Sequence, residues 1–215
     1  MYQILRNAGR LIPLLVLLLA GPLHAQSQNN GCAPTNDGNI GAQLIVMRMT
    51  VADSLHGKVV DSLRFPLGLF HSGCDGASWR WAVYRDTTGP APGDLVDFQS
   101  DSTVIAQSAW SARGDSLLVV GSGSATAENG TALDSGSTYW FGVWSSCNNS
   151  AYVQCSVQYS GGNVAWSETY NADSAHADPP DPYGTPTGSI GRCYSFELFV
   201  SEPSAEEPES VRQIW

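Results

Sequence analysis

The sequence predicts an all-β fold, an antiparallel two-sheet β-sandwich of about nine or ten strands. Three observations lead to this prediction. Short runs rich in Val, Ile, Tyr, Trp and Phe alternate with clusters of Gly, Asp, Asn, Ser and Pro. No long stretch carries the apolar stripe of an amphipathic helix. Charged residues make up only 14% of the 215 residues while hydrophobic ones make up 42%, as we expect of a turn-rich extracellular β protein.

The chain begins with a segment typical of a secretory signal peptide. Arg6 and Arg10 precede an apolar run over residues 11–23, and the small residue Ala25 follows. We therefore predict cleavage after Ala25 and a secreted location, either extracellular or periplasmic. A membrane-spanning helix needs about 20 consecutive apolar residues, so this run, which Pro13 interrupts, is too short to predict membrane insertion.

The predicted cleavage divides the chain into a signal peptide over 1–25, a lead-in over 26–42, a β-sandwich domain over 43–201 and an acidic, disordered tail over 202–215. The formal net charge of -10 becomes -12 after cleavage, because the signal peptide carries two of the 10 basic residues and none of the 20 acidic ones. Nucleic acids and anionic lipid surfaces need clustered Lys and Arg, so this balance argues against both as partners.

Each predicted strand is a short β-branched or aromatic run that is bounded by turn residues. The runs span, in chain order, residues 43–51, 58–70, 78–86, 94–99, 103–108, 116–122, 137–146, 151–159, 163–170 and 192–201. In the second of them Pro66 removes a backbone donor, which favours a sheet edge or a bulge at that point. The length of the chain suits one domain with a sizeable core.

The runs over 78–86 and 137–146 contain four of the seven tryptophans. Neighbouring side chains of a strand point to opposite faces. The later run accordingly places Tyr139, Phe141 and Val143 on one face and Trp140, Gly142 and Trp144 on the other. Because both faces are apolar, we predict a central strand whose second face is either covered or used for binding.

The candidate ligand-binding residues are Trp79, Trp81, Trp140 and Trp144. Flat indole faces stack against the C–H faces of sugar rings while neighbouring polar groups bind the hydroxyls, so an exposed group of them would favour a carbohydrate ligand. The alternative is that each belongs to the hydrophobic core, where most large aromatic side chains lie.

Two motifs resemble those of secreted bacterial surface modules. The first is Trp81-Ala-Val-Tyr-Arg-Asp-Thr-Thr-Gly-Pro-Ala-Pro-Gly-Asp-Leu-Val96, and the second, which follows Trp110, is Leu133-Asp-Ser-Gly-Ser-Thr-Tyr-Trp-Phe-Gly-Val143. Over about residues 80–145 the chain is similar to the choice-of-anchor R type of domain. The resemblance implies a jelly-roll-like sandwich on a cell surface, without an assigned catalytic activity. The cysteines depart from the pattern of these modules.

All five cysteines lie in the predicted mature chain, where an oxidising compartment favours disulfides. Cys147 and Cys155 flank a short turn between two predicted strands, so we predict a hairpin disulfide between them. Cys32 precedes the first predicted strand and Cys193 opens the last, and because terminal strands of sandwiches are often neighbours we predict a second pair here. Cys74 is then left over, either as a free thiol or in another pairing. The spacings match no zinc motif.

The sequence carries no catalytic motif, and we predict that the protein is not an enzyme. The serine-hydrolase pattern Gly-x-Ser-x-Gly does not occur. His71 shares one turn with Cys74, but the members of catalytic triads usually converge from separate elements. A pair among Asp61, Glu168 and Glu197 keeps a glycoside hydrolase as an alternative. The simpler interpretation is that each of these carboxylates faces solvent.

No cofactor is predicted, and calcium is the one ion that the sequence leaves open. Residues 36–39 and the loop with Asp173, Asp178 and Asp181 offer hard oxygen ligands. Neither segment has the spacing of a calcium-binding loop, and acidic loops are commonly just solvated.

These observations favour a secreted, non-catalytic β-sandwich for recognition or surface architecture, with glycans or a surface protein of the cell envelope as the partner class. One alternative is a structural or adhesin subunit that assembles with itself or docks through the tail that ends in residues 211–215. The other alternative is a glycoside hydrolase on the same scaffold.

Overall fold

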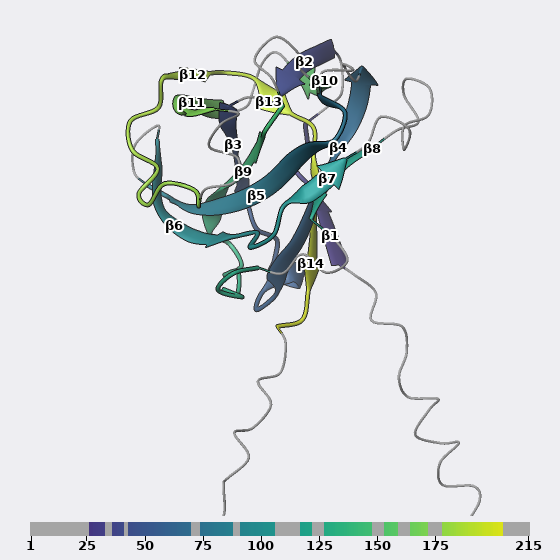
Figure 1. Cartoon of the computed structure of the whole chain (residues 1–215). Coiled ribbons are helices and arrows are strands. Elements are labelled where there is room, and N and C mark those ends of the chain that lie inside the picture. The colour runs from purple at the N-terminus through teal and green to yellow at the C-terminus, as the bar shows by residue number, and fades with distance from the viewer. Residues whose placement is uncertain are drawn as a thin grey trace, which may run out of the picture.

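A computed structural model describes residues 26–32, 36–40, 43–69, 74–87, 91–105, 117–121, 127–147, 153–158, 164–171 and 178–203 (Figure 1). Within these ranges the strands β1 to β14 form two antiparallel sheets. The one helical element there is the short 3-10 turn η1 (Asp53–Leu55). The predicted fold class, an all-β antiparallel two-sheet sandwich, is confirmed.

The first sheet has the strand order β1-β14-β4-β10-β13, with β2 also paired to β10 and β8 to β4. Its strands are β1 (Gln26–Asn29), β2 (Asn36–Ile40), β4 (Val59–Leu69), β8 (Leu117–Gly121), β10 (Val153–Gln158), β13 (Cys193–Tyr194) and β14 (Glu197–Ser201). The second sheet has the order β12-β11-β3-β9-β5-β6, with β7 beside β5. Its strands are β3 (Gln43–Thr50), β5 (Ala77–Asp86), β6 (Pro92–Phe98), β7 (Thr103–Ile105), β9 (Thr138–Ser145), β11 (Val164–Asn171) and β12 (Gly188–Ile190).

Two stretches differ from the predicted organisation. The lead-in over 26–42 contributes β1 and β2, which pair with β14 and β10. Because β1 has the polar sequence Gln-Ser-Gln-Asn, it gives no hydrophobic signal, and its pairing with β14 positions it. The predicted strand over 192–201 is divided into β13 and β14, since the chain leaves strand geometry at Ser195 and Phe196.

Large apolar side chains of the two sheets meet in one core between them. The first sheet contributes Leu63, Phe65, Val120, Phe196, Leu198 and Val200, and the second contributes Ile45, Met47, Trp79, Trp81, Phe141 and Val143. The ring centroid of Phe196 lies 5.9 Å from those of both Phe65 and Phe141. Aromatic contacts therefore bridge the two sheets.

A second apolar cluster covers the outer face of the second sheet. It comprises Leu44, Val46, Ala82, Tyr84, Phe98, Trp140, Trp144 and Tyr183. Tyr183 belongs to the segment over 178–187, which precedes β12. Its hydroxyl donates to the Leu44 carbonyl at 3.0 Å, and its ring meets that of Tyr84 edge-on with centroids 5.1 Å apart. The chain itself thus covers the second apolar face that the sequence predicts.

A disulfide joins Cys74 to Cys147, with their Cα atoms 4.7 Å apart. Cys74 precedes β5 and Cys147 follows β9, and the pairing of Trp79 with Ser145 in these neighbouring strands brings the two cysteines together. The predicted disulfide between Cys147 and Cys155 is therefore wrong. Cys155 lies in β10, which belongs to the other sheet.

Cys32 and Cys193 are free thiols in this structure, and they are neighbours. The Cys32 thiol donates to the Cys193 carbonyl oxygen at 2.6 Å, and Asn30 Nδ2 donates to Cys193 Sγ at 3.6 Å. Burial, with a smaller contribution from the Cys32 thiol, raises the pKa of Cys193 to about 12. The predicted Cys32–Cys193 disulfide is not formed here and stays a prediction.

We expect the Cys74–Cys147 disulfide to stabilise the fold strongly. The two residues are 73 apart in sequence. Closing a loop of this size restricts the unfolded chain by an amount worth about 4 kcal/mol. The double substitution Cys74→Ser, Cys147→Ser should therefore lower the free energy of unfolding by about 3 kcal/mol or more in denaturant titration. Peptide mapping without reductant checks the pairing, and a fragment that links Cys147 to Cys155 would contradict it.

Gly121 ends β8 in a conformation that favours glycine, with a φ of 95°. A Cβ atom here would lie 2.4 Å from the Asp61 carbonyl oxygen and 2.8 Å from Trp81 Nε1. We expect Gly121→Ala to reduce the free energy of unfolding by about 3 kcal/mol, through overpacking and backbone strain. The matched control is Gly136→Ala, where φ is 72° but a Cβ atom meets nothing within 4 Å. It should cost about 1 kcal/mol, and equal losses in the two variants would contradict the packing argument.

Candidate functional site

The four candidate tryptophans lie in the neighbouring strands β5 and β9. Trp79 and Trp81 are 0% exposed, and Trp140 and Trp144 are 1% exposed. The first two point into the core between the sheets, whereas Trp140 and Trp144 lie in the outer cluster with Tyr183. Of the two alternatives for these candidate ligand-binding residues, burial in the hydrophobic core is the one observed, because the sheet is covered on both faces at these positions.

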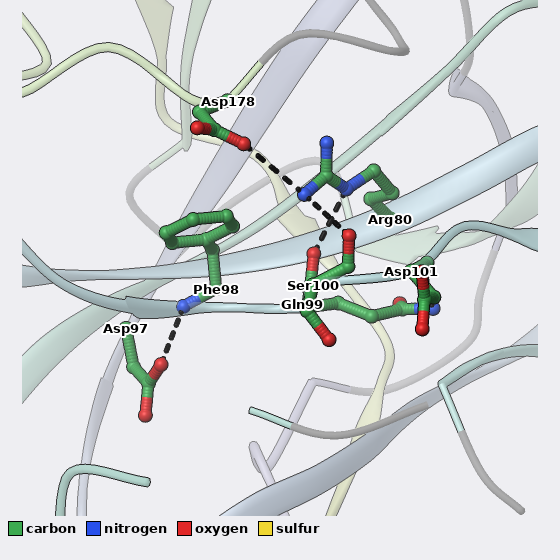
Figure 2. A network of polar contacts seen from close by, with 7 residues as sticks. All are labelled: Arg80, Asp97, Phe98, Gln99, Ser100, Asp101 and Asp178. Carbon is green, nitrogen blue, oxygen red and sulfur yellow. Dashed lines mark hydrogen bonds and ion pairs between the residues drawn. The ribbon is translucent and has the colours of Figure 1, made fainter. Parts of the chain in front are cut away.

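Arg80 is a buried cation among these aromatic residues, with only 4% of its surface exposed. Figure 2 shows its guanidinium group beside the backbone that follows β6. Its Nε donates to the Gln99 carbonyl at 2.8 Å, and its Nη2 donates to the Ser100 carbonyl at 3.0 Å. The guanidinium carbon lies 5.3 Å from the ring centroid of Phe98 and 5.4 Å from that of Trp144. These hydrogen bonds and aromatic contacts stabilise the buried positive charge of Arg80.

Asp178 also contacts this guanidinium group, from the segment that covers the sheet (Figure 2). The distance from Arg80 Nη2 to the carboxylate is 3.5 Å, yet 77% of the Asp178 side chain is exposed. Water screens such a pair strongly, so it contributes little to stability. The carbonyls of Gln99 and Ser100 therefore provide the main anchorage, and we assign Arg80 a structural role.

A buried carboxylate organises the loop before β9 in a similar way. Asp97 is 1% exposed. It accepts hydrogen bonds from the backbone N–H groups of Phe98 at 2.8 Å, Asn129 at 3.0 Å and Thr131 at 2.7 Å. These donors replace the water that the carboxylate loses on burial. Asp97 is therefore a structural residue as well.

On the outer face of the second sheet, the side chains of β3, β5 and β9 change from apolar to polar toward one end of these three strands. Beyond the covered cluster, β3 presents Arg48 and Thr50, β5 presents Asp86, and β9 presents Thr138. The antiparallel register aligns these positions, since Arg48 lies opposite Trp140 and Thr50 lies opposite Thr138. A polar end of the face thus adjoins its covered apolar end.

An open hollow of about 320 Å³ lies where β5 ends and β9 begins. Its lining residues are Arg85, Asp86, Ser137, Thr138 and Tyr139. The first two end β5 and the others lie where β9 begins, and Arg85 is paired with Tyr139 across the two strands. We call this concavity the polar hollow, because its lining residues carry guanidinium, carboxylate and hydroxyl groups.

Asp86 is held firmly at the polar hollow. One of its carboxylate oxygens accepts a hydrogen bond from the Arg48 guanidinium, and the other accepts one from Trp140 Nε1 at 2.8 Å. The Arg48 and Asp86 side chains are 38% and 16% exposed, so this ion pair lies at the surface. Nearby, the hydroxyls of Thr50 and Thr138 share a hydrogen bond of 2.8 Å. Such contacts restrict the conformations of the Asp86 and Thr138 side chains.

The lining of the polar hollow consists mainly of residues with polar or charged side chains. Its lining residues include no histidine and no cysteine. Both oxygens of Asp86 accept hydrogen bonds from neighbouring side chains. Sequence reasoning missed this site. Its lining residues belong to the two motifs over 81–96 and 133–143, but only the pairing of β5 with β9 shows that these motifs meet.

The other candidates from the sequence are dispersed over the molecule. Asp61, Glu168 and Glu197 lie in β4, β11 and β14. Glu197 accepts a hydrogen bond of 2.6 Å from a serine of β1, in agreement with a position away from the core. His71 and Trp110 lie outside the described residues.

Among the residues that the structure describes, no group of three or more His, Cys, Asp or Glu side chains could hold a metal ion. Asp178 contacts Arg80, and Asp181 accepts a hydrogen bond from the Leu95 N–H at 2.9 Å. Both carboxylates therefore help to hold the covering segment on the sheet. Asp173 lies outside the described part of the chain, so the calcium hypothesis rests on the sequence alone.

We expect Arg80→Met to destabilise the fold and Asp178→Asn to leave its stability nearly unchanged. Loss of the guanidinium group removes the buried donor from the Gln99 and Ser100 carbonyls, at a cost of about 2–3 kcal/mol. An exposed ion pair contributes about 0.5 kcal/mol or less. Denaturant unfolding of both variants measures the difference, and equal losses would mean that the ion pair, rather than the carbonyls, anchors Arg80.

In the described ranges no helix combines the length and the hydropathy that a bilayer-crossing segment requires. Comparisons of the chain with protein-family models, with curated proteins and with solved structures gave no match. The resemblance to the choice-of-anchor R type of domain stays a prediction that rests on the two motifs.

Proposed function

We propose that this protein is a secreted, non-catalytic β-sandwich module that recognises glycans through the polar hollow. The observation that carries the proposal is the hollow itself, a concavity of about 320 Å³ with a lining of hydrogen-bond donors and acceptors. Sugar hydroxyls both donate and accept hydrogen bonds, so guanidinium, carboxylate and hydroxyl groups complement them. Small-molecule sites have volumes of about 300–1,000 Å³, and a hollow at the lower end of this range suits a short saccharide.

The packing of the second sheet supports recognition at the strand ends rather than on the sheet face. The tryptophans of β5 and β9 are buried in the two apolar clusters. The polar hollow, by contrast, is open, and Arg48 and Trp140 hold its carboxylate, Asp86, in place. Preorganised groups lose little conformational entropy when a ligand binds.

Secretion is part of the same proposal. The basic and apolar segments over 1–25, with Ala25 before the cleavage point, support export. The disulfide between Cys74 and Cys147 also supports it, because disulfides persist mainly in oxidising compartments.

We expect the secreted chain to bind at least one member of a panel of oligosaccharides in titration calorimetry. Ser137→Tyr should weaken that binding by at least about tenfold, because the added ring fills the polar hollow. The backbone hydrogen bonds of Ser137 to Asp134 and Val51 do not involve its side chain, so the fold should survive.

The matched control for this experiment is Ser201→Tyr, which places the same ring at the exposed end of β14. It should bind like the unaltered chain. No binding to any member of the panel would overturn the glycan proposal, and equal binding by both variants would show that the polar hollow is not the site.

A further inference from the structure

Arg85 gives the polar hollow a positive charge that no carboxylate of the lining neutralises. Arg85 is exposed, and no ion pair among the described residues includes it. Asp86 is the acidic residue of the lining, and its charge is balanced by the Arg48 guanidinium. Its other oxygen is engaged by Trp140. One guanidinium group therefore remains available to a ligand.

An arginine, Arg85, lines the polar hollow although the chain as a whole is acidic. The sequence has only 10 Lys and Arg residues against 20 Asp and Glu, a formal net charge of -10. Arg48 of β3 and Arg85 of β5 flank β9 from its two sides, opposite Trp140 and Tyr139. The Arg48 charge is paired with Asp86, so Arg85 is the lining residue whose positive charge can meet a ligand.

We infer that the polar hollow takes an anionic saccharide, a sugar with a carboxylate or sulfate group, and that Arg85 binds that group. This inference rests on the proposed glycan recognition and narrows it. A guanidinium group offers parallel N–H donors that fit two oxygens of a carboxylate or a sulfate. The side chains of Ser137 and Thr138 belong to the same lining, and their hydroxyls complement those of a sugar ring.

The acidity of the rest of the chain does not oppose this contact strongly. At physiological salt the screening length is about 8 Å, so charges beyond the hollow act weakly on a ligand that touches Arg85. A long polyanion would extend over the remaining acidic chain and be repelled by it. Short oligosaccharides are therefore the appropriate probes.

The test is titration calorimetry of the secreted chain at about 0.15 M salt with two matched pairs of short oligosaccharides. One pair is a uronic acid trisaccharide and its methyl ester, and the other is a sulfated trisaccharide and its desulfated form. We expect the charged member of at least one pair to bind at least about tenfold more tightly than its neutral partner. Arg85→Gln should remove this preference, while Arg85→Lys, which keeps the charge without the fork of donors, should retain part of it.

The matched control is Arg192→Gln, which removes the same charge outside the polar hollow. It should keep the preference for the charged oligosaccharide. Thermal unfolding establishes that all variants are folded. Equal binding of charged and neutral partners by the unaltered chain would overturn this inference and leave glycan recognition standing. Equal losses in Arg85→Gln and Arg192→Gln would also overturn it, because attraction would then be unspecific. If the unaltered chain bound no oligosaccharide, charged or neutral, the proposed function itself would fail.

Discussion

The strand β9 carries large apolar side chains on both faces, and the arrangement of the chain follows from the need to bury both. Full burial of such a side chain contributes about 1.5–3 kcal/mol, so an uncovered face would cost much of the stability of a domain. The first sheet covers one face, where Phe196 meets Phe141. The segment with Tyr183 covers the other face, in one cluster with Trp140 and Trp144. Two-sided burial therefore determines which surfaces remain for binding.

Hydrophobic alternation predicts the strands that bury a face and misses those that do not. It locates β3, β4, β5, β6, β8 and β9 to within about two residues at each end. It misses β1, whose residues are largely exposed and whose position depends on backbone pairing with β14. The disulfide prediction failed for a related reason. Proximity in sequence favours Cys155 as the partner of Cys147, but the pairing of β5 with β9 brings Cys74 to it.

The candidate site could not be predicted from the sequence, because the pairing register of β5 and β9 brings its residues together. The alternation around Trp140 indicates a second face that is covered or used, but the residue that covers it, Tyr183, lies far along the chain and carries no signal of that role. Arg85 and Ser137 belong to different strand ends that meet only because β5 and β9 pair. The resemblance around residues 80–145 predicts a surface module, and it does not indicate where that module would bind.

The covered aromatic face and the open polar hollow differ in what binding would cost. To use Trp140 and Trp144 as a platform, the chain must lift Tyr183 and give up its hydrogen bond to Leu44. Exposing three large aromatic side chains costs about 6 kcal/mol, at about 2 kcal/mol each, which would weaken an apparent affinity by about 10⁴-fold. The polar hollow carries no such penalty. The buried indole of Trp140 nevertheless contributes to the hollow, since its Nε1 holds Asp86 in position.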